Sequence, residues 1–345
     1  MRVNNIVNIP FLKTKESQEQ KEIAFTGITN PQKLAKPSTD LMKVYFAGTK
    51  PIWSNAGQEK RNQITEFAEE YKSFLNTSKT DLQTVVSMVD KAKEKGFQAW
   101  PEDMPKELLK PGEKYYRVNR NRSVSLIVMG NKPITEGFKM AGSHIDSPHI
   151  MLKAQPLQDA PGGFAIFKTM VHGGIKNPQW TQRNLALVGT VVKTNGEIIK
   201  VDIGNNPDDP VFLIPELAPH VDRGHTEKKP KEGFPKEKMN PIVGLNQPDN
   251  ETSNKVSDQV ENILKEKYGI NREDLLNSQL ALVPAQMARD VGLDRSMISA
   301  YGHDDKSSAY CSMEALFELI DKMIPERTII ATSFSNEEIG SYNNH

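Results

Sequence analysis

The chain has 345 residues, in which 44 Lys and Arg are balanced by 44 Asp and Glu. This length is typical of roughly two domains. The balanced charge excludes the basic surface that nucleic acid requires and the polybasic segment that holds some proteins on membranes. We therefore expect small molecules or other proteins as partners, and neither nucleic acid nor membrane.

Two further features bound the class of protein. Residues 1–15 contain no apolar run long enough for a signal peptide, and no later segment reads as a transmembrane helix, which predicts a cytoplasmic protein. The single cysteine, Cys311, excludes a disulfide framework and a zinc site built on paired thiolates. A metal would therefore need nitrogen and oxygen ligands, and we expect Cys311 to be a small core residue of a helix.

The first predicted elements are two helices followed by three strands. Apolar residues recur at spacings of three and four over 60–76, which is typical of an amphipathic helix. A second helix is expected to begin near Thr80 and to end at Gly96, where glycine allows a left-handed residue. Period-two runs then predict strands over 115–118, 123–129 and 138–142, the last of which leads into His144.

The pattern changes from Gln155 onward. Two β-branched runs over 185–192 and 197–202 flank an Asn-Gly pair, which predicts a hairpin. Residues 224–257 are rich in Lys, Pro, Gly and Asn and predict exposed loop, and a helix is expected over 257–268. After Ala300 a helix around Met313 and a strand over 328–334 return. The alternation indicates an α/β core interrupted by a largely β insertion.

Side chains suited to metal chemistry gather at three places, each where a core strand ends or a core helix begins. Open α/β sheets bind ligands at the carboxyl edge of their strands, so the three segments are expected to lie together. The first is His144-Ile145-Asp146, where extended backbone would place the imidazole and the carboxylate on the same face. The alternative is a hydrogen-bonded pair on a loop, which is common for this tripeptide.

The other two places are pairs of acids. Asp304 and Asp305 precede the helix around Met313, where carboxylates also serve as simple helix caps. Glu337 and Glu338 follow the strand 328–334, and extended backbone would point one at a metal and the other at a bound water. Surface glutamate pairs without a function are the alternative.

The order and the amino-acid sequences of these motifs resemble those of one known family. GSHIDSPHIMLK (142–153), AYGHDDKSSAY (300–310) and SNEEIGS (335–341) are similar to the metal-binding and general-base motifs of the aspartyl aminopeptidase family of two-zinc metallopeptidases. More diffuse similarity extends from about residue 40 to the end of the chain. The resemblance implies a zinc-dependent aminopeptidase that removes N-terminal residues from peptides.

The resemblance also implies a ligand set for two zinc ions per subunit. His144 would bind one zinc, Asp304 would bridge both and Glu338 would bind the second, with Asp305 as the bridging residue if the alignment is off by one. Two ions roughly 3.5 to 4 Å apart lower the pKa of a bridging water and stabilise the tetrahedral intermediate.

Three other residues take roles from the resemblance. Glu337 would act as general base and Asp146 would orient the site. His220, in PELAPHVDR, matches a histidine that reaches the active site of a neighbouring subunit. The alternative for His220 is an exposed loop residue after Pro219, and the sequence alone favours it.

The chain departs from the family after SNEEIGS, where Tyr342 to His345 replace a glycine-rich continuation. The family supplies an aspartate to the first zinc and a histidine to the second from a segment with no counterpart here. Each ion would then keep two ligands, so we expect the 345-residue chain on its own to be inactive. A clipped or partial sequence is one interpretation, and an inactive paralogue that serves in assembly or binding is the alternative.

For the architecture we expect an α/β fold in three parts. Residues 1–154 and 299–345 would form a three-layer α/β metallopeptidase domain, the second part incomplete, and 155–298 a β-rich inserted domain. The resemblance implies that this insertion mediates dimerisation and that the homo-oligomer is a dodecamer assembled from dimers.

Overall fold

The computed structural model describes residues 52–102, 109–222, 224, 228–248 and 255–341. The chain separates into two compact units, 1–64 and 65–345. Among the described residues, no helix is both long and apolar enough to cross a membrane. The expectations made for 1–15 and 342–345 fall outside these residues.

The first unit contributes α2 (Ile52–Asn55) and the first residues of α3 (Gln58–Thr77). The Arg61 guanidinium lies over the Trp53 ring, 5.4 Å from its centroid, and donates a hydrogen bond to the Trp53 carbonyl oxygen. The second unit contains both large sheets and all the motif residues.

A five-stranded mixed sheet carries the predicted α/β core. Its order is β1-β2-β3-β13-β4, with bounds β1 (Gln98–Ala99), β2 (Lys114–Asn119), β3 (Ser123–Val128), β13 (Ile329–Phe334) and β4 (Lys139–His144). β13 runs antiparallel to β3 and parallel to β4, with Phe334 opposite His144. The carboxyl ends of β13 and β4 therefore lie at the same edge of the sheet.

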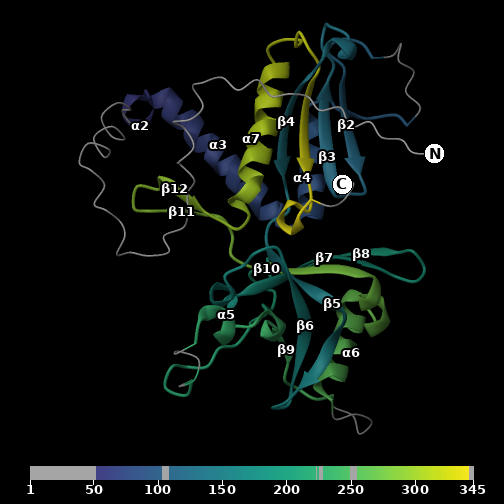
Figure 1. The fold of residues 1–345 in the computed structure, drawn as a ribbon, viewed down its shortest axis with the longest axis vertical. Helices are drawn as coiled ribbons and strands as arrows, with labels where there is room; N and C mark the ends of the chain where they lie inside the picture. Colours follow the sequence, from purple (N-terminus) through teal and green to yellow (C-terminus); the bar gives the residue numbers. More distant parts are fainter. Residues whose placement is uncertain (1–51, 103–108, 223, 225–227, 249–254, 342–345) are drawn as a thin grey trace, which may run out of the picture. The chain divides into compact units, whose positions relative to one another are not determined.

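Three of the predicted helices pack on this sheet (Figure 1). α3, α4 (Asp81–Glu94) and α7 (His303–Ile320) contribute to one apolar core with β3 and β13, at whose centre the Tyr310 side chain is fully buried. α4 begins with a capping box between Thr80 and Gln83, and Gly96 follows it with φ +81°, as the sequence predicts.

The second large sheet has six strands, and every pair of neighbours in it is antiparallel. Its order is β8-β7-β10-β5-β6-β9, with bounds β8 (Ile198–Ile203), β7 (Leu185–Val192), β10 (Ser278–Pro284), β5 (His149–Ala160), β6 (Phe164–His172) and β9 (Ile242–Gly244). The predicted β7–β8 hairpin is confirmed. α6 (Val256–Tyr268) packs on β6 and β9, and contributes Val256, Val260 and Leu264 to the core of this sheet.

Two sequence predictions are wrong in detail. The 224–257 region is not exposed loop throughout, because Met239 is buried and β9 pairs with β6; α5 (Pro230–Gly233) also lies here. Cys311 is exposed rather than in the core, because the buried stripe of α7 runs through Ala309, Tyr310 and Met313 and leaves position 311 to solvent.

The mixed α/β class is thus confirmed, while the three-part division stays a proposal. β5 spans the expected boundary at 154/155. A two-stranded ribbon of β11 (Arg289–Val291) and β12 (Met297–Ser299) lies just before α7 and is separate from both large sheets.

Candidate metal centre

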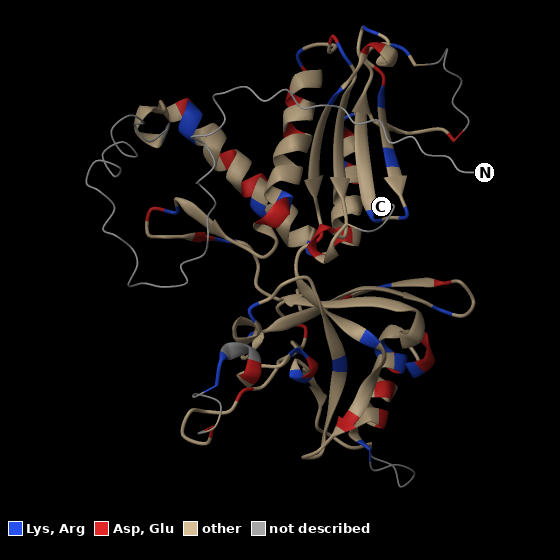
Figure 2. Cartoon of the chain, in the orientation of Figure 1, with Lys and Arg blue, Asp and Glu red and all other residues tan. Residues whose placement is uncertain are grey.

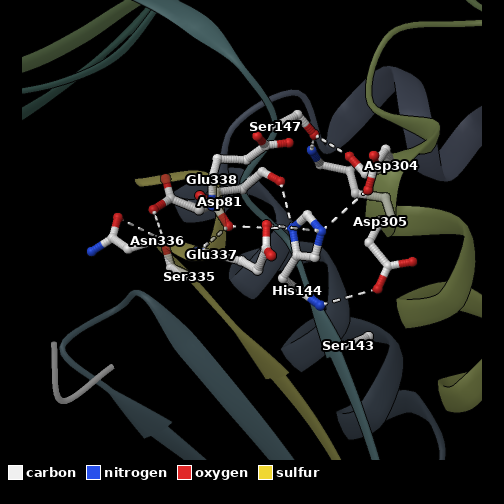
Figure 3. Close-up of polar contacts among 12 residues, drawn as sticks. Asp81, Ser143, His144, Ser147, Asp304, Asp305, Ser335, Asn336, Glu337 and Glu338 are labelled. Atoms are coloured by element: carbon white, nitrogen blue, oxygen red, sulfur yellow. Dashed lines mark hydrogen bonds and ion pairs between the residues drawn. The ribbon is translucent and has the colours of Figure 1, made fainter. Parts of the chain in front are cut away.

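The three motif segments come together at the edge where β4 and β13 end (Figure 3). His144 is the last residue of β4, Asp304 and Asp305 lie at the start of α7, and Glu337 follows β13. The acidic residues of the turn after β13 colour the ribbon red in Figure 2. The three segments were expected to lie together, and contacts made by His144 join them.

The hydrogen bonds of the His144 ring define which nitrogen can bind a metal. Nδ1 lies 3.0 Å from the Asp146 carbonyl oxygen, which can only accept, so Nδ1 carries a proton and donates it. Nε2 faces the Asp304 Oδ1 at 3.2 Å and the Glu337 Oε2 at 3.7 Å. This arrangement leaves Nε2 as the nitrogen available to a metal.

The Asp146 carboxylate is buried, with 2% of the residue exposed, and it contacts several residues of the centre. Its Oδ1 lies 3.4 Å from the His144 Nδ1 and accepts the Glu337 backbone N–H at 3.2 Å. Its Oδ2 accepts the Glu338 N–H at 3.2 Å and faces the His172 Nε2 at 3.2 Å. One carboxylate thus holds the imidazole and the Glu337-Glu338 turn in a common frame.

The backbone at the glutamate pair is not extended, so that sequence expectation is wrong. Residues Glu337–Ile339 form a 3-10 turn entered through Asn336 at φ +65°. The turn aims two successive N–H groups at Asp146, which extended strand geometry would point to opposite sides. The two side chains still differ in setting, since Glu337 has 57% of its side chain exposed and Glu338 packs closely against Gly173.

The aspartate pair contacts His144 instead of capping α7. Asp304 and Asp305 have non-helical backbone angles, and no side-chain cap bond is made at Gly302. Asp305 Oδ2 accepts the backbone N–H of His144 at 3.3 Å, whereas Asp304 reaches the ring nitrogen. Of the two, Asp304 is therefore the one placed to share a metal with His144.

Burial and hydrogen bonds shift the pKa values of three groups at the centre. Burial opposes ionisation of Asp146, but hydrogen bonds from His144, His172 and two backbone N–H groups outweigh it and hold its pKa well below the usual range. The hydrogen bond to Asp146 raises the pKa of His144 to about 9. Burial, followed by the charges of Asp304 and Asp146, raises the pKa of Glu338. The carboxylates at this edge therefore favour a nearby cation.

The side chains at the centre are of the types that bind zinc, but fewer of them come together than a zinc site in an enzyme requires. Imidazole nitrogen and carboxylate oxygen are ordinary zinc ligands, and a zinc site in an enzyme normally takes three from the protein. His144 and Asp304 are close enough to share one ion. Across 52–341, leaving out the undescribed stretches, no group of three or more His, Cys, Asp or Glu side chains is arranged to hold a metal.

Three residues that the sequence did not single out support the centre. Lys306, fully buried, donates from Nζ to the Ser147 Oγ at 2.6 Å, and Ser147 donates in turn to the Asp304 carbonyl oxygen at 3.0 Å. The third residue is His172, which supports the centre through its contact with the Asp146 carboxylate. Ser147 and Lys306 lie within the motifs 142–153 and 300–310, so their closeness in sequence to the proposed ligands could have identified them. His172 carried no such signal, since it comes from β6 of the other sheet.

A second set of contacts fixes the end of β13. Ser335 donates to the Asp81 Oδ2 at 2.7 Å, and Arg122 donates to the same oxygen at 2.6 Å. Asp81 is the first residue of α4, so the helix, the β2–β3 turn and the strand end are tied at one carboxylate. This restrains the chain immediately before Glu337.

Three other histidines, His220, His303 and His225, differ in their surroundings. His220 lies exposed on a turn, and no contact within the described residues joins it to the centre. His303 bonds Tyr71 and the Ile298 carbonyl oxygen, as expected of a structural histidine. His225 lies outside the described residues.

A family model described as "Aminopeptidase I zinc metalloprotease (M18)" matches residues 74–345. The chain belongs to the M18 family of aminopeptidases. The family suspected from the motifs is thereby confirmed, and with it the zinc metalloprotease description that its model bears.

Individual M18 proteins match over most of this chain. A probable M18 family aminopeptidase 1 of Borrelia garinii subsp. bavariensis is 38% identical over 290 residues, which are 84% of this chain and 62% of the relative. The crystal structure of an M18 aminopeptidase from Thermotoga maritima superposes with a TM-score of 0.78 at 34% identity, covering 86% of this chain and 62% of that one. The chain therefore spans a little under two thirds of these relatives.

A more distant neighbour shows the fold alone. The S. cerevisiae mApe1 dodecamer superposes with a TM-score of 0.64 at 21% identity, covering 81% of this chain and 63% of that one.

Proposed function

We propose that this chain carries active-site residues of a zinc-dependent aminopeptidase, which removes N-terminal residues from peptides with a water activated by two metal ions. The observation that carries the proposal is the contact between the His144 Nε2 and the Asp304 Oδ1 at 3.2 Å, with the opposite ring nitrogen held by Asp146. Family membership gives this contact its interpretation.

The ligands in this proposal are His144, Asp304 and Glu338. When bound, zinc would act as a Lewis acid and would lower the pKa of a coordinated water. His144 presents Nε2 because Asp146 fixes its tautomer, and Asp304 projects into solvent with 84% of its side chain exposed. Asp305 is less suited to bridging, because it bonds the His144 backbone.

Glu337 is the proposed general base. Its carboxylate is exposed, lies 3.7 Å from the His144 Nε2, and is tied to Asp146 only through its backbone N–H. It is therefore free to take a proton from a water held beside His144 and to return it to the leaving amine. Asp146 orients the ring and the glutamate turn, and does not itself reach solvent.

Zinc binding by the 345-residue chain tests the ligand assignment. Calorimetric titration with zinc is expected to show binding that His144→Ala and Asp304→Asn each weaken by at least about tenfold. His303→Ala is the matched control, because His303 is bonded away from the centre. Zinc binding that survives loss of both His144 and Asp304 would refute the assignment.

Turnover tests the reaction. The family resemblance implies two further ligands beyond Glu338, so the chain on its own is expected not to hydrolyse aspartyl, glutamyl or leucyl substrates. We define the full gene product as the protein encoded by the uninterrupted reading frame that includes codon 345. If the genomic frame continues past that codon, the full gene product with zinc should hydrolyse such substrates, and no turnover on any of them would contradict the proposal.

A non-catalytic role in assembly or binding is the second candidate. The match to the M18 family does not favour this alternative over an enzyme. A reading frame that stops at codon 345, together with no turnover, would turn the choice toward this alternative.

We also propose a homo-oligomer in the cytoplasm, with the insertion 155–298 mediating dimerisation. The support for assembly is the shared fold with the yeast mApe1 dodecamer. In such an assembly the exposed His220 would reach the centre of a neighbouring subunit rather than its own. Light scattering of the purified protein tests the assembly.

A further inference from the structure

His172, the last residue of β6, reaches across from the six-stranded sheet to the candidate metal centre. Its Nε2 lies 3.2 Å from the Asp146 Oδ2, and both residues are buried, with 8% and 2% exposed. An ionised carboxylate has no proton to donate, so the His172 Nε2 carries the proton of its bond to Asp146. Asp146 in turn holds the His144 ring and the N–H groups of Glu337 and Glu338.

The orientation of the His172 ring is fixed by its neighbour across the strands. His149 of β5 is the direct partner of His172 in the β5–β6 register. The two rings stack with centroids 4.5 Å apart and planes 14° apart. The His149 Nδ1 lies 2.8 Å from the Ser147 carbonyl oxygen and donates to it. Burial, then the neighbouring His172, lowers the pKa of His149 to about 4, so the supporting ring stays uncharged at neutral pH.

Gly173 brings the same strand end against the second glutamate. It has φ +73°, and a Cβ atom placed on it would lie 3.1 Å from the Glu338 Cβ and 3.2 Å from the Glu338 Oε2. Any larger residue would displace the Glu338 side chain. Gly174, the next residue, has open space around it and no positive φ.

We propose that His172 and Gly173 are positioning residues of the metal centre, through which the six-stranded sheet sets the orientation of Asp146 and the location of the Glu338 carboxylate. This inference rests on the proposed zinc function. It adds a role for the end of β6, which supplies neither a proposed ligand nor the proposed base.

Two substitutions at His172 separate the hydrogen bond from the stacked ring. His172→Phe keeps a ring against His149 but removes the donor, whereas His172→Gln restores an N–H near the position of Nε2 without the ring. In zinc-free chains labelled with ¹⁵N-histidine, His172→Phe should shift the resonances of the His144 ring nitrogens, because Asp146 loses the bond that holds it against that ring, and His172→Gln should return them toward the unmodified values. His144 resonances unchanged in His172→Phe would overturn the proposal.

Zinc affinity is the second readout. His172→Phe is expected to weaken zinc binding by about tenfold or more, as found for supporting residues of metal ligands. His172→Gln should recover most of the affinity. Affinity equal to that of the unmodified chain in His172→Phe would also overturn the proposal. If the unmodified chain itself shows no binding that depends on His144, the proposed function fails, and the zinc-free spectra still decide the positioning role.

The glycine pair gives a test that is independent of His172. Gly173→Ala should weaken zinc binding and Gly174→Ala should not, with circular dichroism confirming that both variants are folded. If His172→Phe does not fold, this pair and His172→Gln carry the test. Equal zinc affinity in the two alanine variants would contradict the role of Gly173.

Discussion

Glu337 and Glu338 are adjacent in sequence, yet their surroundings differ enough to assign them different chemistry. Glu337 is exposed and faces the His144 Nε2, whereas Glu338 lies against Gly173 and has a pKa raised by burial and by neighbouring acids. A base must exchange a proton with solvent, and a partly buried carboxylate among other carboxylates is stabilised by a cation.

The first prediction separates these roles in the full gene product. Glu337→Gln should lower peptide hydrolysis by about 10² to 10⁴-fold, the usual contribution of a general base, and leave the zinc content nearly unchanged. Glu338→Gln should lower the zinc content. Metal analysis beside an aminopeptidase assay measures both, and loss of zinc in Glu337→Gln would mean that the two roles are exchanged.

The proximity of the three motifs could be predicted from the sequence, while the roles of their residues stay predictions. His144, Asp304 and Glu337 could be expected to meet because strands of one sheet end at one edge, and the structure brings them into contact. His172 could not be found in this way, because its contact with Asp146 depends on the register of β5 and β6 in another sheet. The Glu337 turn was missed because a 3-10 turn leaves no clear periodicity in three residues.

At the scale of elements, the pairing of β7 with β10 depends on a single glycine. Gly189 lies opposite Leu280 with φ +141°, and a Cβ atom on it would lie 2.0 Å from the Gln279 carbonyl oxygen. No side chain can move to relieve this contact, because the obstacle is backbone of the neighbouring strand.

The second prediction follows from that contact. Gly189→Ala should reduce the free energy of unfolding by more than about 2 kcal/mol, since β7 and β10 must separate locally. Gly196→Ala, in the β7–β8 turn, has open space and a positive φ, so it should cost only about 1 kcal/mol of backbone strain. Urea unfolding of the three chains measures both, and equal costs would show that the sheet adapts at Gly189.

Lys79 connects two elements through a buried ammonium group. It lies between α3 and α4, is 2% exposed, and donates to the Asn205 Oδ1 at 2.5 Å and the Pro284 carbonyl oxygen at 2.8 Å. Burial lowers its pKa to about 8, against a weaker opposing effect of Asp202.

The third prediction is a pH dependence of stability. Because the folded pKa of about 8 lies below the unfolded value, the unfolded chain binds more protons between the two, so stability rises with pH across this window. Relative to Lys79→Met, the unmodified chain should gain up to about 3 kcal/mol between pH 8 and 10.5. Urea unfolding at several pH values tests this, and a constant difference between the two chains would contradict it.

Element types were largely predictable from periodicity, and their partners were not. α3, α4, α6 and α7 all fall where apolar spacing placed helices. β5 and β6 form the most extensive strand pair, yet the bulge between Leu152 and Leu157 interrupts the alternation that would reveal β5. Strand order and sheet membership depend on long-range packing, which a local pattern does not contain.

At the scale of the whole molecule, His220 is an exposed residue on a turn, and no contact among the described residues joins it to the centre. We propose that His220 contributes to catalysis from a neighbouring subunit. The proposed assembly therefore has a specific consequence for mixed oligomers.

The fourth prediction is complementation between two inactive forms of the full gene product. Glu337→Gln and His220→Ala, each inactive or weakly active alone, should regain activity when mixed under conditions that allow subunit exchange. The recovered active sites combine an intact Glu337 from one chain with His220 from the other. Exchange shown by mass spectrometry without any recovery would place His220 outside the reaction.

The order of strands in the five-stranded sheet also has a consequence for synthesis. β13 lies between β3 and β4, although residues 145–328 separate it from β4 in the chain. At ordinary translation rates this delay is roughly 10 to 40 s, during which β3 and β4 each lack the partner between them. Their unpaired edges are open to other strands in this interval, so a nascent chain is expected to need protection by chaperones until β13 emerges from the ribosome.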